Sequence, residues 1–566
     1  MKGVFNMRKI ISVVLTLCFL FALMMPVASA AGTERLPIIY IRGNGEPLYY
    51  EDGSKLVASL DDISFGDSSE EGEEADVTKD KIVDAAVNIL KPFVLEGMIF
   101  DNWDNYGKAV YEELVPLFGE DAGLDENGNA KKGTGVDKTK LANSEANSNS
   151  AWLYNTNQDY EFCFDWRLSP YDHVDRLHTY ITNIMTATGK TQVNIYGRCL
   201  GGGLLMAYLE KYGHLGHIKN VMFVDILSNE ANCISKALSG KMEFDANYLE
   251  KYLGQVDYLG KTGEGVGFAF TDILNEIVFK TMDFFNQIAV TDKLLGGIEE
   301  LYEKLYQALI PAIMHASGMA TQVNYWTCVA EEDMDQALDI MFPDNEDGIR
   351  EKYAGLIEKI LYYREHVSSD LKGFYDTLTE NGIYFGFTGK YGYLNAPYAV
   401  DADLPSDSLV SLTHATFGAT TAPIGKTLSE EYINARIAEG NGRYISADKT
   451  VDLSTAYAPD RTWVFKNAHH DTNSPVMPII YEFLNGTNET VDTVTAGTQF
   501  MVYDINTNTV ATMTEENCGD LEFMKIGEEK PTTVSRLTAF FRFLSMLINI
   551  IRDIFSGNFD LGSLFG

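Results

Sequence analysis

Gly197-Arg198-Cys199-Leu200-Gly201 is the stretch that decides the fold of this chain of 566 residues. The residues before it, 192–196, are apolar at alternate positions, which is typical of a buried strand. The residues after it, 204–213, are good helix formers that end in a glycine. The pattern therefore predicts a strand, a tight turn and a helix in immediate succession, with Cys199 at the turn.

Such a turn holds its central residue in a strained backbone conformation, so the neighbouring residues must be small. Gly197 and Gly201 stand at the two positions where a Cβ atom would collide. The central side chain then points above the sheet, and the N–H groups that open the helix face a developing negative charge. This context is that of a nucleophile elbow, with a thiol at Cys199. A buried structural cysteine on a glycine-rich turn is the alternative.

The pentapeptide resembles the α/β-hydrolase superfamily in the version with Cys in place of Ser, as in dienelactone hydrolases and polyhydroxyalkanoate synthases. A second stretch, Asp165-Trp166-Arg167-Leu168-Ser169-Pro170, lies between a strand at 160–165 and a helix that stops at Gly189. This order is similar to the lipase branch that includes lecithin:cholesterol acyltransferase. The resemblance implies an α/β-hydrolase fold, a mostly parallel central sheet flanked by helices, over roughly residues 35–230 and 380–485.

The first expected strand, 35–41, runs into Arg42-Gly43-Asn44-Gly45. In α/β-hydrolases the loop after an early strand contributes one N–H to the oxyanion hole. The resemblance implies Asn44 or Gly45 for that N–H, and Leu200, which follows the nucleophile, for the other. A plain strand-to-turn glycine pair is the alternative.

The segment 404–412 occupies the position of the family's acid loop. Asp407 matches the carboxylate that this loop carries, with Asp403 and Asp401 as nearby competitors. A triad needs such a carboxylate to hold the imidazole tautomer and to stabilise the imidazolium. An aspartate that caps a turn is the alternative for Asp407.

His469 and His470 follow the last strong strand, 461–465, and a helix at 478–484 comes behind them. Family members show a Lys-Asn-x-x-His spacing, which favours His470 over His469. The chain order Cys, Asp, His is the order of the α/β-hydrolases. Two surface histidines on a loop are the alternative.

The resemblance implies a secreted acyl hydrolase that cleaves carboxylic esters, lipid-like or otherwise apolar, through a thioester acyl-enzyme. His470 would draw the proton from Cys199, and the thiolate would attack the ester carbonyl. A small-molecule or lipid ester is the expected partner, and neither a metal nor a cofactor is expected. An acyltransferase and a non-catalytic binding protein on a hydrolase scaffold are the two rival functions.

The composition sets limits on partners and compartment. The chain has 44 basic and 81 acidic residues, a net charge of −37, which argues against nucleic acid as a partner. Residues 1–30 combine a basic start, an apolar stretch and an Ala-x-Ala site, so we expect a signal peptide cleaved after Ala30. Five cysteines follow it, and an odd number leaves at least one thiol without an intramolecular disulfide.

The α/β alternation stops near residue 230, and 231–379 is largely helical in pattern. In the superfamily an insertion at this point forms a cap over the nucleophile. The final helix is apolar on all but one narrow face, which indicates self-association, docking or peripheral membrane binding. The expected divisions are a signal peptide at 1–30, a hydrolase core at 31–230 and 380–490, a helical cap at 231–379, a β-hairpin extension at 491–530 and an amphipathic helix at 531–566.

Overall fold

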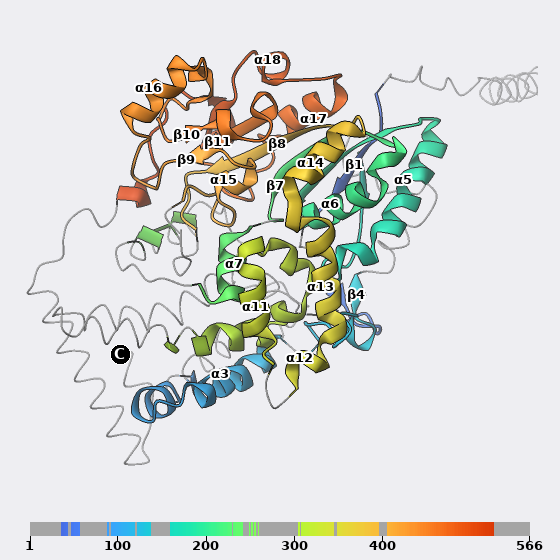
Figure 1. Ribbon diagram of the computed structural model, residues 1–566, viewed down its shortest axis with the longest axis vertical. Coiled ribbons are helices and arrows are strands. Elements are labelled where there is room, and N and C mark those ends of the chain that lie inside the picture. Colours follow the sequence, from blue (N-terminus) through green and yellow to red (C-terminus); the bar gives the residue numbers. More distant parts are fainter. Residues whose placement is uncertain are drawn as a thin grey trace, which may run out of the picture.

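A computed structural model gives the fold of the chain (Figure 1). The residues that the structure describes are 35–43, 47–56, 88–89, 92–118, 121–136, 159–228, 230–241, 248, 251–252, 254–255, 258–259, 304–305, 307–344, 348–395 and 404–525. The expected signal peptide, the expected C-terminal helix and four candidate site residues, Asn44, Gly45, Asp401 and Asp403, lie outside these ranges.

An eight-stranded sheet forms the centre of the molecule, in the order β13-β12-β11-β8-β7-β6-β1-β5. Every neighbouring pair is parallel except β12 and β13, which are antiparallel. The prediction of an α/β fold with a mostly parallel sheet is confirmed. The strands are β1 (Ile38–Ile41), β5 (Asp159–Phe162), β6 (Val193–Cys199), β7 (Ile218–Ile226), β8 (Tyr384–Tyr391), β11 (Thr462–Lys466), β12 (Phe500–Asp504) and β13 (Thr509–Thr512).

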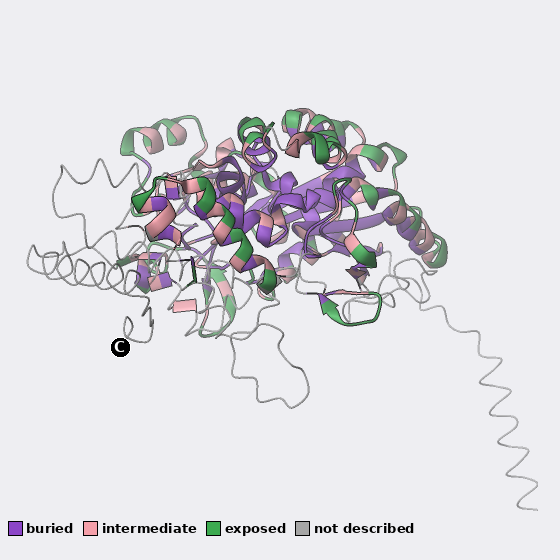
Figure 2. Cartoon of the chain, turned by 90° about the horizontal axis from the view of Figure 1, so that it is seen from below, coloured by how far each residue is buried: buried purple, intermediate pink, exposed green. Residues whose placement is uncertain are grey.

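The central strands are apolar on both faces because helices cover both sides of a parallel sheet. Alternate residues of one strand enter different cores: Phe223 of β7 packs in one hydrophobic cluster and Met222 in another. The first cluster contains residues of α5 (Val174–Thr188) and α6 (Gly201–Tyr212), and the second contains residues of α17 (Met477–Asn485). In Figure 2 the central strands of the sheet are buried, and most exposed residues lie on the outer helices and loops; the edge strand β13 is largely exposed.

The insertion between β7 and β8 is helical, as expected, and contains no strand among the residues that the structure describes. Figure 1 shows α7, α11, α12 and α13 grouped on the side of the molecule away from α16, α17 and α18. The elements of this insertion are α7 (Asn232–Ser239), η7 (Met319–Thr321), η8 (Val323–Cys328), η9 (Glu331–Asp333), α11 (Met334–Met341), α12 (Ile349–Lys352), α13 (Ala354–His366), η10 (Ser368–Asp370) and α14 (Leu371–Glu380).

The predicted hairpin after residue 490 is present as β12 and β13, but it does not stand apart from the core. β12 pairs in parallel with β11, with Val464 opposite Phe500, so the hairpin forms one edge of the central sheet. The core therefore continues past residue 490, because Phe500 and its neighbours supply an apolar strand for the open edge of β11.

Shorter elements surround this centre. They are β2 (Leu48–Tyr49), β3 (Lys55–Leu56), η2 (Phe93–Ile99), α3 (Trp103–Phe118), η3 (Lys131–Gly133), β4 (Gly135–Val136), η5 (Pro170–Asp172), η6 (Gly213–Leu215), α15 (Leu412–Ala415), β9 (Thr420–Thr421), α16 (Glu430–Ala438), η11 (Gly442–Tyr444), β10 (Val451–Asp452), η12 (Leu453–Thr455), η13 (Pro459–Arg461), α18 (Val491–Val494) and η14 (Glu522–Lys525).

Candidate active site

Cys199 is the last residue of β6 and stands at a strained turn. Its φ of 54° is in the left-handed region, which is unfavourable for a residue with a side chain. Helix α6 begins two residues later, at Gly201. The strand, tight turn and helix expected from the sequence are therefore present, and Cys199 occupies the strained position.

The two glycines beside Cys199 allow the turn to pack closely. A Cβ atom at Gly201 would collide with the carbonyl oxygen of Arg42 and lie 2.6 Å from that of Ile41, at the end of β1. A Cβ atom at Gly197 would lie 3.0 Å from the side chain of Leu205. The start of α6 can approach the neighbouring strand only because these positions carry no side chain.

The helical insertion also supports the turn, which the sequence pattern did not indicate. Asn324 of η8 donates its side-chain amide to the carbonyl of Trp166 at 3.1 Å and to that of Leu200 at 3.4 Å. Asn324 is fully buried, and a Cβ atom at Gly203 would lie 2.8 Å from its Oδ1. One side chain of the insertion thus links the Asp165-Trp166-Arg167 loop to the turn at Cys199.

The loop after β1 reaches Cys199 directly. A Cβ atom at Gly43 would lie 2.6 Å from the Cβ and 3.0 Å from the Sγ of Cys199. Asn44 and Gly45, the next residues in the sequence, lie outside the described residues. Leu200, the other candidate for the oxyanion hole, is fully buried and occupies the N-cap position of α6.

We expect Gly43→Ala to impair the site because the new methyl group would displace Cys199. Moving a reacting group by about 1 Å can cost on the order of 10²-fold in rate. Ester hydrolysis and thermal unfolding of Gly43→Ala measure the effect. Gly519→Ala is the control, because a Cβ atom there has nothing within 4 Å. Equal activity of the two variants would contradict the close packing of Gly43 on the thiol.

The structure brings Asp407 and His470 into contact. Nδ1 of His470 lies 2.7 Å from Oδ2 of Asp407, and the backbone N–H of His470 donates to the Asp407 carbonyl at 2.9 Å. The other carboxylate oxygen accepts hydrogen bonds from the N–H groups of Leu409 and Val410, at 3.0 and 2.9 Å. Both residues are almost completely buried. The carboxylate is therefore held on both oxygens, and it orients the imidazole.

The electrostatics of the pair follow from burial and from neighbouring charges. Burial opposes ionisation of Asp407, but His470, the N–H of Val410 and the charge of Lys390 lower the pKa of its carboxyl. Burial would lower the pKa of His470, while the charges of Asp407 and Cys199 and the hydrogen bond to Asp407 raise it to about 10. Nδ1 is engaged by Asp407, so Nε2 is the ring nitrogen left for a partner, and this buried atom has no hydrogen bond within the described part of the chain.

His469 has a different environment from its neighbour. Its Nε2 lies 2.8 Å from the hydroxyl of Ser408, and its ring packs edge-on against Tyr393. Complete burial lowers its pKa to about 4, so the ring is neutral near pH 7. Of the two histidines, the geometry joins His470 to Asp407 and directs His469 to Ser408.

These shifts predict that the protein loses stability as the pH falls below 6.5. His469 and His173 are buried, and burial lowers the pKa of each to about 4, from 6.5 when the chain is unfolded. The unfolded state therefore binds more protons between pH 6.5 and pH 4, which favours unfolding. The lowered pKa of one such histidine reduces the free energy of unfolding by roughly 3 kcal/mol at pH 4.

Urea unfolding at a series of pH values measures this effect. The free energy of unfolding is expected to fall steadily between pH 6.5 and pH 4, and His469→Gln is expected to make that slope shallower. A slope that is the same in wild type and variant would show that His469 is not held neutral by burial.

The side chains of Arg198 and Lys390 hold the loop that carries His470 by hydrogen bonds. The sequence pattern did not indicate a role for either residue. Arg198, next to Cys199, donates to the carbonyl of His470 at 2.9 Å and to the carboxylate of Asp471 at 2.9 Å. Lys390 of β8 donates to the same carbonyl at 2.9 Å. It also forms an ion pair of 2.7 Å with Asp225. The signal that could have identified Lys390 is its position, since it is a charged residue near the end of the mainly apolar strand β8.

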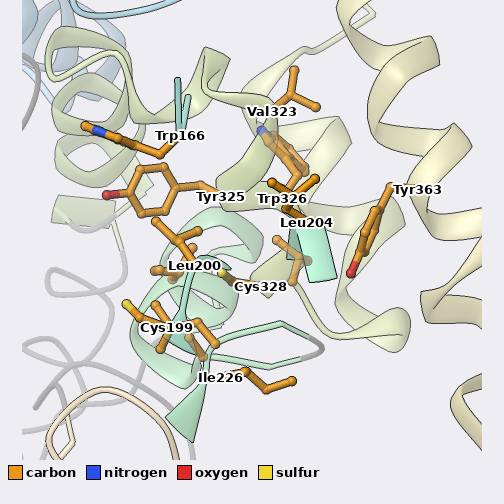
Figure 3. Close-up of a cluster of buried hydrophobic side chains, with 14 of the residues drawn as sticks. Trp166, Cys199, Leu200, Leu204, Ile226, Val323, Tyr325, Trp326, Cys328 and Tyr363 are labelled. Atoms are coloured by element: carbon orange, nitrogen blue, oxygen red, sulfur yellow. The ribbon is translucent and has the colours of Figure 1, made fainter. Parts of the chain in front are cut away.

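The surroundings of Cys199 are apolar. Figure 3 shows Cys199 and Leu200 in a buried cluster with Trp166, Tyr325 and Cys328. The cysteines at 163, 199, 233, 328 and 518 are all thiols and form no disulfide. Burial raises the pKa of Cys233 to about 12 and that of Cys328 well above its usual value. Both are therefore poor nucleophiles, and neither has a positive φ.

Comparisons with known proteins add little. No family model matches the chain, and no curated protein matches it. One solved structure with a likeness is titled "The crystal structure of Tle4-Tli4 complex", with 10% identity and a TM-score of 0.26. The alignment covers 91% of this chain and 99% of that chain. A likeness at this TM-score carries no argument about fold or function.

The described part of the chain contains no group of three or more His, Cys, Asp or Glu side chains arranged to hold a metal ion. None of its helices is both long enough and apolar enough to cross a membrane.

Proposed function

We propose that this protein is a secreted acyl hydrolase that cleaves carboxylic esters with a Cys199–His470–Asp407 triad. We assign it to the lipase-like branch of the α/β-hydrolase superfamily. The observation that carries the proposal is the contact between Asp407 and His470, together with a cysteine on a strained strand-to-helix turn whose charge helps to raise the pKa of that histidine. Nucleophile, base and orienting carboxylate in this relation are the arrangement that acyl transfer requires.

The position of the site in the sheet supports the proposal. Cys199 ends β6, Gly43 follows β1, and His470 follows β11, all in one parallel sheet. Parallel strands place their carboxyl ends at the same edge, and open α/β sheets bind ligands outside that edge. Residues far apart in the sequence therefore converge where a substrate would enter.

In the proposed reaction, His470 holds the proton that the Cys199 thiol gives up, as its pKa of about 10 implies near pH 7, and the sulfur of Cys199 forms a bond to the ester carbonyl carbon. The N–H of Leu200 and one N–H from the Asn44-Gly45 loop stabilise the oxyanion. Collapse of this intermediate breaks the bond to the alcohol oxygen, which leaves with the proton from His470. Water, deprotonated by His470, then attacks the thioester, which releases the carboxylic acid and restores the thiol.

The residues near Cys199 favour an apolar acyl group. Trp166, Leu200, Ile226 and Tyr325 are buried in the cluster that contains the nucleophile. We propose that the helical insertion at 231–379 is a cap that completes this apolar cluster, because Asn324 of the insertion already binds the turn at Cys199. A lipid-like ester is the substrate class that an apolar lining of this kind accommodates.

The experiment that tests the function is hydrolysis of p-nitrophenyl esters and thioesters with short and long acyl chains, followed by mass spectrometry of the quenched protein. We expect turnover of the ester, a preference for apolar acyl chains, and an acyl adduct on Cys199 that hydroxylamine removes.

Addition of an alcohol separates a hydrolase from an acyltransferase, because a transferase gives the new ester faster than the free acid. Absence of both ester turnover and an acyl adduct would favour the non-catalytic binding protein.

A further inference from the structure

A buried ion pair lies behind the candidate triad and contacts it at one atom. Lys390 of β8 and Asp225 of β7 have fully buried side chains, and Nζ lies 2.7 Å from Oδ2. The ammonium also donates to the carbonyl of His470 at 2.9 Å and to Oδ1 of Asn473 at 3.2 Å. All three contacts of Lys390 are thus made to acceptors, and two of them belong to the loop that carries the proposed base.

The carboxylate of this pair is itself firmly placed. Asp225 has a φ of 44°, a left-handed conformation that is strained for a residue with a side chain. Its other oxygen, Oδ1, accepts a hydrogen bond of 3.3 Å from the hydroxyl of Thr388. Asp225 therefore fixes the ammonium of Lys390 within the sheet. From this position the ammonium donates to the carbonyl of His470.

The backbone of His470 has every polar group engaged. Its N–H donates to the Asp407 carbonyl, and its carbonyl accepts from Arg198 and from Lys390. These donors come from β6 and β8, on either side of β7 in the sheet. With the peptide held from two strands, the imidazole has little freedom to turn away from Cys199.

We propose that the Lys390–Asp225 ion pair is a positioning device for His470, which holds the imidazole in register with the Cys199 thiol. This inference rests on the proposed function of the triad. A need for stability does not account for the pair, because a buried ion pair can be exchanged for neutral side chains at little or no cost in stability. Groups that hold the ligands of a metal from behind contribute on the order of 10- to 100-fold to activity, and we expect an effect of the same order from groups that hold His470.

The test compares two ion pairs of similar burial. The site variant carries Lys390→Met with Asp225→Asn, which leaves no unpaired buried charge. The control carries Lys466→Met with Asp448→Asn, from an ion pair of 2.9 Å whose side chains are 4% and 5% exposed. Lys390→Gln with Asp225→Asn is a second neutral pair, whose amides can still bond to each other if the first variant does not fold.

Two readouts separate positioning from stability. For the site variant we expect kcat on a p-nitrophenyl ester to fall about 10- to 100-fold with KM within about twofold, while the control stays near wild type. The second readout is the rate at which iodoacetamide alkylates Cys199 from about pH 5 to pH 9, located by peptide mass spectrometry. Its pH profile is expected to change only in the site variant.

The outcomes distinguish this inference from the proposed function. If wild-type protein hydrolyses no ester, the proposed function fails, and the alkylation profile still decides whether Lys390 positions His470. If wild-type activity depends on Cys199 but the site and control variants behave alike in both readouts, the ion pair is structural and the inference is overturned.

Discussion

Cys199→Ala is expected to lower kcat/KM for ester hydrolysis by about 10⁴-fold or more, because it removes the sulfur that forms the acyl-enzyme in the proposed reaction. The fold should survive, since alanine keeps the Cβ atom that packs on Gly43 and removes only the sulfur. Thermal unfolding checks the second point, and steady-state kinetics with an ester of the preferred chain length checks the first.

Cys328→Ala and Cys233→Ala are the matched controls for this variant. Both thiols are buried near Cys199, and their charges influence one another. We expect each control to retain activity within about tenfold, since neither thiol stands at a strained turn. Cys199→Ser adds a further comparison. A rise in esterase activity would indicate a site built for a serine nucleophile that has since lost its serine, and not a site built for a cysteine nucleophile. Unchanged activity of Cys199→Ala would refute the nucleophile.

His470→Gln is expected to lower kcat by about 10³-fold, within the range that general base catalysis contributes. The glutamine amide can still donate to Asp407, so the buried carboxylate keeps a partner and the protein should fold. It cannot take the thiol proton, so the reaction of Cys199 with both ester and iodoacetamide should slow. Kinetics and alkylation at pH 7 measure the two effects.

His469→Gln is the adjacent control, and the two histidines share burial and sequence context. Its ring contacts Ser408, and a glutamine can still accept that hydrogen bond. We expect activity within about tenfold of wild type. The reverse pattern, with His469→Gln inactive and His470→Gln active, would assign the base to the other histidine and contradict the geometry described above.

Local sequence patterns determined the class of fold. Alternating apolar residues before Gly197 and helix formers after Gly201 specify a strand and a helix within one short stretch, because periodicity is a property of adjacent residues. The strained position of Cys199 and the helical insertion after β7 were predicted in this way, whereas the mostly parallel sheet was implied by the resemblance to the α/β-hydrolases. The hairpin at β12 and β13 was also predicted, although its place at the edge of the central sheet was not.

The tertiary structure decided which side chains act together. His470 and Asp407 are 63 residues apart and Asn324 and Leu200 are 124 apart, so no local pattern could show that they touch. The same holds for Lys390, whose strand looked merely apolar in the sequence and whose partners lie on β7 and on the loop after β11. Sequence alone thus determined the strained turn and the residue at its centre, Cys199, because both are local. The contacts between base, acid and ion pair depend on how the sheet aligns the ends of its strands, and only the folded chain defines that alignment.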